Sequence, residues 1–273
     1  MSIITLLTDF GTEDAYAGVM KGVILSINAS AVVVDVCHTV APQDLIGAAY
    51  LINAVYKYFP KGTIHIIVVD PGVGGDRSIV AVGLAEHVFL APDNGVLTLL
   101  MDENDTDDIV RVENPHFFLN EVSHTFHGRD IFAPVASHLS RGVPIDQFGR
   151  SLNPQDLVRL NISKPYLSEK GELIGTIISI DHFGNCISNI DDSRLKEFIQ
   201  NSPEKTLVIK VDKTVIKGLS QSYLNAAPGD PAAVIGSFGF LEIAVNCGNA
   251  SRRLKVSKGH TLSLKLRPGS KIH

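Results

Sequence analysis

An acid and a base in a glycine-rich loop are the first residues of this chain whose types and spacing suggest chemistry. Asp70 and Arg77 lie in the stretch V-V-D-P-G-V-G-G-D-R-S-I-V, residues 68–80, between two apolar runs. A carboxylate at the end of a buried strand can bind a ligand or accept a proton, because α/β folds place ligand sites at strand ends. The alternative is a surface turn with an Asp–Arg ion pair, which contributes only about 0–1 kcal/mol. Taken alone, the loop favours that alternative.

The glycines of this loop do not predict a phosphate cradle. A P-loop needs a lysine after its last glycine, and a dinucleotide-binding fingerprint needs glycines that open a helix. This loop has no lysine, and the strand-like residues S-I-V-A-V-G-L follow it. The helix N-terminus that would bind a pyrophosphate is therefore missing, and a dinucleotide-dependent dehydrogenase is the weakest of the candidate functions.

A histidine in a second motif is the next candidate. His127 and Arg129 flank a glycine in S-H-T-F-H-G-R-D-I-F-A-P, residues 123–134, before a helix-like segment at Ile131–Leu139. A single histidine at such a place is most often a helix cap or a buried structural residue. The case for chemistry comes from reading it with T-D-F-G at residues 8–11, A-P-D-N-G at residues 91–95 and the Asp70 loop.

The elements that must position these residues alternate between strands and helices. The pattern predicts strands at Ile3–Thr8, Ala31–Val36, Thr63–Val69 and Ser78–Leu84, and helices at Ala15–Ile27 and Asp44–Phe59. Asp14 or Glu13 can stand at the start of the first helix. Such alternation is typical of an α/β domain with a mainly parallel sheet, which we expect over residues 1–165.

The rest of the chain, residues 166–273, has a different pattern. A proline-containing polar stretch at 151–172 resembles a linker, and only Asp192–Asn201 has a convincing helical pattern after it. Short strand-like segments follow one another at Leu173–Ile180, Leu207–Val211, Thr214–Ile216, Ala232–Ile235, Leu241–Val245 and Leu262–Leu266. We expect a smaller all-β domain there, a barrel or a sandwich.

Composition limits the possible partners and the cellular setting. The 273 residues carry a formal net charge of −5, and 45% are hydrophobic. We expect no nucleic acid partner, no membrane-spanning segment, no signal peptide and a cytoplasmic location. The three cysteines form no C-x-x-C, and no H-x-x-E-H or H-E-x-x-H spacing occurs, so we expect neither disulfides nor a metal. Six histidines are read as structural: His38, His65, His116, His124, His138 and His182.

Several motifs together resemble one family. They are L-L-T-D-F-G-T-E-D-A-Y, V-V-D-P-G-V-G-G-D-R, A-P-D-N-G and F-H-G-R-D-I-F-A-P, followed by D-H-F-G-N and G-S-F-G-F-L-E-I-A. The chain resembles the S-adenosylmethionine hydroxide adenosyltransferases, which are related to the fluorinating and chlorinating adenosyl enzymes. The resemblance implies an N-terminal α/β domain, a C-terminal β-barrel, and a homotrimer whose sites lie between neighbouring subunits.

This resemblance implies hydrolysis of S-adenosylmethionine to adenosine and methionine, with Asp70, Arg77 and His127 as the catalytic set and no cofactor. Attack of an activated water on C5′ expels a neutral thioether, so the difficulty lies in the nucleophile rather than the leaving group. Either Asp70 or His127 can accept its proton, whereas the guanidinium cannot. Halogenating relatives offer hydroxyl groups where this chain has Val73 and Gly128, so a halide-using transferase is the weaker alternative. The other alternative is a sensor that binds S-adenosylmethionine or adenosine without turnover.

The resemblance also implies two substrate-binding acids in the N-terminal domain. Asp9 ends the first strand and corresponds to an acid that accepts the ribose hydroxyls; otherwise it caps a helix or forms a turn. Asp14 corresponds to an acid that contacts the amino-acid part of the substrate; otherwise it is an ordinary first-turn helix acid.

The other implied substrate-binding residues lie in the C-terminal domain. Asp181 can pair with the methionine ammonium, while Phe183 and Asn185 suit adenine by stacking and by hydrogen bonds. The motif D-H-F-G-N can otherwise be a simple turn. Three further residues lie in segments that line the adenosine pocket of relatives: Tyr223, Ser237 and Glu242. The neighbouring Phe238 replaces an arginine of some relatives, which leaves the partner of the methionine carboxylate open.

Overall fold

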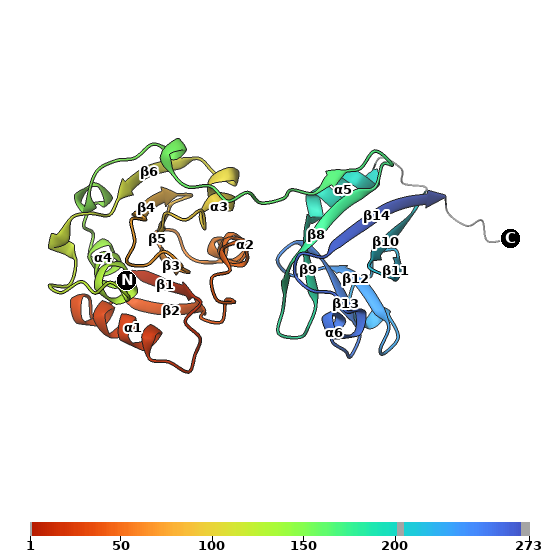
Figure 1. Ribbon diagram of the computed structural model, residues 1–273, viewed down its shortest axis with the longest axis horizontal. Helices are drawn as coiled ribbons and strands as arrows, with labels where there is room; N and C mark the ends of the chain where they lie inside the picture. Colours follow the sequence, from red (N-terminus) through yellow and green to blue (C-terminus); the bar gives the residue numbers. More distant parts are fainter. Residues whose placement is uncertain (1, 201–204, 269–273) are drawn as a thin grey trace. The chain divides into compact units, whose positions relative to one another are not determined.

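The chain folds into two compact units, residues 1–161 and 162–273. The computed structural model describes residues 2–200 and 205–268 (Figure 1). The first unit contains a mainly parallel sheet with helices, and the second contains an antiparallel sheet. This confirms the fold class expected from the sequence.

The N-terminal unit is built on a sheet with strand order β2-β1-β3-β5-β4-β6. Strands β2, β1, β3 and β5 run parallel to one another, whereas β4 pairs antiparallel with both β5 and β6. The β3–β4 loop that carries Asp70 and Arg77 therefore starts from the middle of the sheet and passes over β5. The strand bounds are β1 Ile3–Thr8, β2 Val32–Cys37, β3 Ile64–Val68, β4 Ile79–Leu84, β5 His87–Pro92 and β6 Thr106–Arg111.

Two apolar layers cover this sheet because successive strand residues point to opposite faces. Ile66 packs in a cluster with Met20 and Phe132, and the next residue, Ile67, packs in a cluster with Ile52 on the other side. The first cluster involves α1 and α4, and the second involves α2 and α3. The helix bounds are α1 Tyr16–Ile27, α2 Leu45–Val55, α3 Thr98–Glu103 and α4 Ala133–Ser140.

The two predicted helices of this unit differ slightly from their expected bounds. Asp44 is the N-cap of α2 and its carboxylate accepts from the backbone N–H of Gly47 at 2.8 Å. That helix ends at Val55 and continues as a 3₁₀ turn at Tyr56–Tyr58 before Pro60. Neither Asp14 nor Glu13 caps α1, whose N-cap is Ala15 without a side-chain hydrogen bond.

The C-terminal unit is an antiparallel sheet with order β11-β10-β14-β8-β9-β13-β12, and β7 pairs with β8. Strands β11 and β12, at the two ends of this order, contact each other, so the sheet nearly closes into a barrel. The helix expected at Asp192–Asn201 is α5, Asp192–Gln200, and Asn201 lies outside the described residues. A short helix, α6 Ala250–Leu254, was not predicted. The strands are β7 Tyr166–Leu167, β8 Leu173–Ile180, β9 Cys186–Asp191, β10 Lys205–Val211, β11 Thr214–Lys217, β12 Pro231–Ile235, β13 Phe240–Val245 and β14 Thr261–Pro268.

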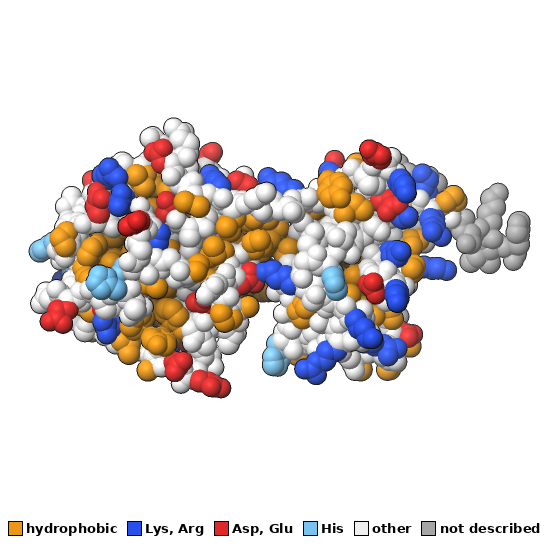
Figure 2. Space-filling model, in the orientation of Figure 1, with side chains coloured by type: hydrophobic (Ala, Val, Ile, Leu, Met, Phe, Trp, Pro, Cys, Tyr) orange, Lys and Arg blue, Asp and Glu red, His pale blue; other side chains and the backbone are white. Residues whose placement is uncertain are grey.

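The surface shows how charge is distributed on each unit. On the face drawn in Figure 2, acidic and basic side chains are mixed on the N-terminal unit, whereas lysine and arginine gather on the C-terminal unit. Among the described residues, none of the helices combines the length and the apolar character needed to cross a bilayer. The absence of a nucleic acid partner stays a prediction.

Candidate active site

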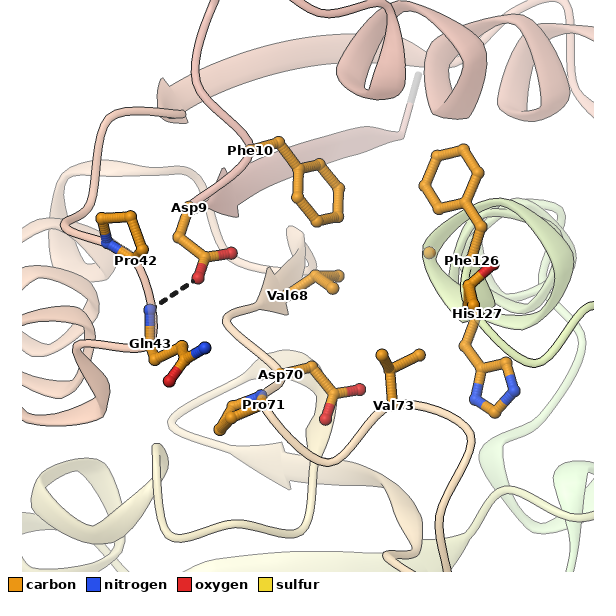
Figure 3. A pocket seen from close by; sticks show the side chains of 12 residues that line it. Asp9, Phe10, Pro42, Gln43, Val68, Asp70, Pro71, Val73, Phe126 and His127 are labelled. Atoms are coloured by element: carbon orange, nitrogen blue, oxygen red, sulfur yellow. Dashed lines mark hydrogen bonds between the residues drawn. The ribbon is translucent and has the colours of Figure 1, made fainter.

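A pocket of about 200 Å³ opens at the carboxyl ends of β1 and β3 (Figure 3). Asp9 directly follows β1 and Asp70 lies just past the end of β3, so two acidic residues meet at one edge of the sheet. His127 enters from the loop before α4. The lining residues are Asp9, Phe10, Pro42, Gln43, Val68, Asp70, Pro71, Val73, Thr125, Phe126, His127 and Gly128.

Arg77 holds Asp70 through a bidentate contact. Its Nε donates to Asp70 Oδ2 at 2.9 Å and to Oδ1 at 3.1 Å, and its Nη2 donates to Oδ2 at 2.5 Å. The side chains are 11% exposed for Arg77 and 4% for Asp70, so this is a buried pair rather than the surface ion pair that the sequence left open. A fork of donors on both carboxylate oxygens sets the plane and orientation of the carboxylate.

The same guanidinium reaches His127. Arg77 Nη2 lies 2.8 Å from His127 Nδ1, and because a guanidinium has no acceptor, Nδ1 must accept this hydrogen bond. Burial first, and the charge of Arg77 second, lower the pKa of His127 below its ordinary value of 6.5. The imidazole is therefore neutral at pH 7, with its proton on Nε2 and its only lone pair committed to Arg77.

Close contacts bring the Asp70 loop and the His127 loop together. Gly74 has φ +78°, and a Cβ built at this position would lie 2.1 Å from the carbonyl oxygen of His124. Only glycine permits this conformation and this close approach. Asn94, in the A-P-D-N-G motif, donates from Nδ2 to the carbonyl of Val69 at 2.9 Å, just before Asp70.

The loop that carries His127 is held by a buried acid. The carboxylate of Asp130 is fully buried and accepts from the backbone N–H of Ser123 at 2.8 Å and from its hydroxyl at 2.7 Å. Arg129 Nε donates to the same carboxylate at 2.5 Å. Residues Gly128–Phe132 form a π-helical turn, a feature often found at functional sites. His127 thus stands at the entry of an irregular, tightly tethered turn.

Asp9 is also anchored, by a residue that sequence reasoning missed. The backbone N–H of Gln43 donates to Asp9 Oδ2 at 2.8 Å, drawn as the dashed line in Figure 3. Gln43 has φ +64° and lies in the connection between β2 and α2, where no motif pointed to it. By contrast, Phe10 and Phe126 lie inside T-D-F-G and T-F-H-G, so those motifs carried the signal for them.

The pocket wall beside Asp70 and His127 has no hydroxyl at the two positions where the family resemblance places one in halogenating relatives. Val73 lines the pocket with an apolar side chain. Gly128 has no room for a side chain without displacement, because an added Cβ would lie 3.1 Å from both Met20 Sδ and Phe126 Cε2. At these two positions the pocket therefore offers no side-chain donor to a halide, although Thr125 also belongs to the lining.

The structure does not bring every predicted residue of the N-terminal unit to the pocket. Asp14 is exposed in the segment before α1 and is not among the lining residues. Its local sequence cannot reveal this, because a residue just before a helix can face a site or solvent equally well. The implied contact of Asp14 with the substrate stays a prediction.

The predicted residues of the C-terminal unit form two local pairs. Asp181 accepts from the backbone N–H of Asn185 at 2.8 Å and from its Nδ2 at 2.9 Å, which closes a turn between β8 and β9. Tyr223 donates its hydroxyl to Glu242 Oε2 at 2.8 Å. Burial, followed by the contact with Glu242, raises the pKa of Tyr223 to about 12. Burial also raises the pKa of Glu242, despite that hydrogen bond.

The remaining residues of this set are exposed on the same unit. Phe183, at the tip of the 181–185 turn, is 74% exposed, and Ser237 is exposed in the β12–β13 turn. An aromatic ring held out on a tight turn can stack on a base at little conformational cost. D-H-F-G-N is thus a turn in geometry, and its binding role stays a prediction.

Among the residues that the structure describes, no three histidine, cysteine, aspartate or glutamate side chains form a group able to hold a metal ion. The expectation that no metal is needed stays a prediction.

Comparisons with known proteins cover nearly the whole chain. A family model described as the SAM hydroxide adenosyltransferase N-terminal domain matches residues 4–149, and the corresponding C-terminal domain model matches residues 175–263. A (R)-S-adenosyl-L-methionine hydrolase from Thermus thermophilus is 33% identical, over 97% of this chain and 100% of its own length. A fluorinase from an Actinoplanes species is 29% identical, over 96% and 97% of the two chains.

A solved structure supports the same relationship in three dimensions. The crystal structure of an uncharacterized conserved protein from Thermotoga maritima matches with a TM-score of 0.88 and 35% sequence identity. The match covers 96% of this chain and 99% of the other.

Proposed function

The chain belongs to the S-adenosylmethionine hydroxide adenosyltransferase family, and on that premise we propose that it hydrolyses S-adenosyl-L-methionine to adenosine and L-methionine. Relatives at 31–33% identity over nearly full length are named (R)-S-adenosyl-L-methionine hydrolases. The observation that carries the proposal is the convergence of Asp70, Arg77 and His127 beside one pocket.

The reaction is an in-line displacement at C5′ of the ribose. The oxygen of a water forms a bond to C5′ while the C5′–S bond breaks, and its electron pair goes to sulfur, which leaves as the neutral thioether of methionine. The water loses one proton, and no other co-reactant is needed. Positive charge on sulfur disappears as the bond breaks, so a site shielded from water favours the transition state over the separated reactants.

Asp70 is the residue that accepts the proton. Its Oδ1 receives only the 3.1 Å contact from Arg77 Nε, which leaves acceptor capacity on that oxygen, and the residue lines the pocket. His127 has no free lone pair, because Nδ1 accepts from Arg77 and Nε2 carries the ring proton. His127 therefore positions Arg77, and Arg77 orients the carboxylate. Of the two proton acceptors that the sequence allowed, the geometry favours Asp70.

The substrate contacts follow the site geometry and the family. Asp9 Oδ2 is held by Gln43, which leaves Oδ1 for ribose hydroxyls. Phe183 and Asn185 bind adenine, Asp181 binds the methionine ammonium, and Asp14, Tyr223, Ser237 and Glu242 complete the binding set. The site works without a cofactor or metal. We further propose a homotrimer in which neighbouring subunits share sites; a fully active monomer in sedimentation would contradict it.

One chromatographic run tests the function. The purified protein is incubated with S-adenosyl-L-methionine in the presence of chloride or fluoride, and the nucleoside products are separated. Adenosine as the sole nucleoside supports hydrolysis, a halo-adenosine identifies a halide-using transferase, and unchanged substrate identifies a sensor. In a matched variant, Val73→Thr, a hydroxyl is added at nearly constant volume. We expect it to release adenosine only, because the Asp70 carboxylate still repels a halide.

A further inference from the structure

We propose that His38, acting through Thr8, is a positioning residue for nucleoside binding because it holds the turn that carries Asp9. The inference rests on the proposed function, in which Asp9 binds the ribose. Neither His38 nor Thr8 lines the pocket. Thr8 accepts from the backbone N–H of the lining residue Phe10, and His38 contacts Thr8.

The hydroxyl of Thr8 joins His38 to this turn. Thr8 Oγ1 lies 2.8 Å from His38 Nδ1, and the backbone N–H of Phe10 donates to the same oxygen at 3.3 Å. Thr8 is fully buried and His38 is only 8% exposed, so water does not compete for these contacts. Because Thr8 and Phe10 flank Asp9, the two contacts restrain the backbone on both sides of the carboxylate.

A charged pair behind His38 sets its tautomer. His38 Nε2 lies 2.9 Å from Asp35 Oδ1, and Lys21 Nζ donates to Asp35 Oδ2 at 2.5 Å. The His38 contact has the distance of a hydrogen bond without its alignment, so we assign it to attraction between the ring N–H and the carboxylate. With the proton on Nε2, Nδ1 accepts from the Thr8 hydroxyl, whose oxygen in turn accepts from Phe10.

The loop that carries His38 adds two backbone contacts to the same turn. The N–H of Gly11 donates to the carbonyl of His38 at 2.7 Å, and the N–H of Gln43 donates to Asp9 itself. The connection between β2 and α2 therefore contacts this turn at the Thr8 hydroxyl, the Gly11 backbone and the Asp9 carboxylate. A small displacement of that carboxylate weakens ribose binding, because a hydrogen bond loses strength steeply with misalignment.

The same strand offers a matched control. Thr5 is also fully buried on β1, and its Oγ1 lies 2.8 Å from Nδ1 of another buried histidine, His65. Neither Thr5 nor His65 lines the pocket or contacts the Asp9 turn. Thr5→Val and Thr8→Val thus each remove a threonine–histidine contact from β1. The Thr8 contact lies next to the Asp9 turn, and the Thr5 contact lies away from it.

The test compares adenosine binding and turnover in Thr8→Val, Thr5→Val and Thr8→Ser. We expect both valine variants to be less stable to denaturant. Only Thr8→Val should raise the Kd for adenosine, by calorimetry, and the KM for S-adenosyl-L-methionine, each by about tenfold, with kcat reduced less than threefold. Thr8→Ser retains the hydroxyl and should restore both values to within about twofold of wild type.

The outcomes separate this inference from the proposed function. Equal Kd values for adenosine in Thr8→Val and Thr5→Val would overturn the positioning role, as would a loss confined to kcat. Failure of the proposed function appears separately, as wild-type protein that releases no adenosine from S-adenosyl-L-methionine. If such protein still binds adenosine and Thr8→Val alone weakens that binding, the positioning role stands.

Discussion

Arg77 donates to Nδ1 of His127 across 2.8 Å, and this contact and a proton on Nδ1 exclude each other. A cationic imidazole would carry N–H groups on both nitrogens and would face the guanidinium with like charge. Since the same Nη2 holds Asp70 at 2.5 Å, losing the histidine contact also loosens the carboxylate. We therefore expect the protonation state of His127 to affect how Arg77 holds Asp70.

The first prediction concerns the acid side of the pH–rate profile. Burial and Arg77 lower the pKa of His127, so the imidazole becomes charged only as pH falls below 6.5. We expect kcat/KM to fall on the acid side with an inflection below pH 6.5. In His127→Asn, whose amide oxygen can accept from Arg77 but cannot titrate, this inflection should be absent. An unchanged acid limb in that variant would contradict the assignment.

The second prediction separates the proton acceptor from the residue that positions it. Asp70→Asn keeps the shape of the side chain but cannot accept the proton, so kcat should fall by about 10²–10⁴. His127→Ala should lose much less, about tenfold, because it removes only the contact that positions Arg77. Single-turnover measurements with S-adenosyl-L-methionine give both values, and adenosine affinity reports whether the pocket is intact. A larger loss of kcat in the His127 variant than in Asp70→Asn would identify His127 as the proton acceptor.

The third prediction tests the close contact of Gly74, in the Asp70 loop, with His124, in the loop that carries His127. Gly74→Ala should destabilise the fold by about 1–3 kcal/mol or more and lower kcat/KM, because the new methyl group meets the carbonyl of His124. Gly62→Ala is the control, since Gly62 has nearly the same φ, +79°, but open space around its missing Cβ. Chemical denaturation of both variants isolates the steric clash from the backbone strain. Equal losses of unfolding free energy in the two variants would contradict a steric requirement for glycine at position 74.

The fourth prediction concerns stability and pH, away from the site. Burial, and then His87, lower the pKa of His65 to about 3, so the folded protein keeps this ring neutral. Its contribution to stability is complete above the unfolded pKa of about 6.5 and is lost as pH falls from there toward 3. We expect the unfolding free energy of wild type to decline more steeply over this range than that of His65→Gln, by up to about 1.4 kcal/mol per pH unit. Parallel curves from urea denaturation would contradict the prediction.

Local patterns in the sequence were enough to predict the fold class and to place ten of the fourteen described strands within two residues of their observed bounds, but β5, β6, β7 and β9 were not predicted. Ile3–Thr8 and Leu173–Ile180 were predicted to the residue, because alternating or continuous apolar runs bounded by polar residues have few alternative structures. The motifs around Asp9, Asp70 and His127 also identified three residues that line one pocket. Strand-end residues can be found in this way because the fold class dictates where strand ends meet.

Tertiary structure alone decided how those residues interact. The insertion of β5 between β3 and β4, the approach of Gly74 to His124, and the anchoring of Asp9 by Gln43 depend on contacts between distant segments. No periodicity encodes such contacts, because loop conformation depends on what the loop packs against as well as on its own residues. The sequence by itself determined which groups stand at the carboxyl edge of the sheet. The packing of the loops decided that Arg77 lies between Asp70 and His127, and thereby which of them is free to take a proton.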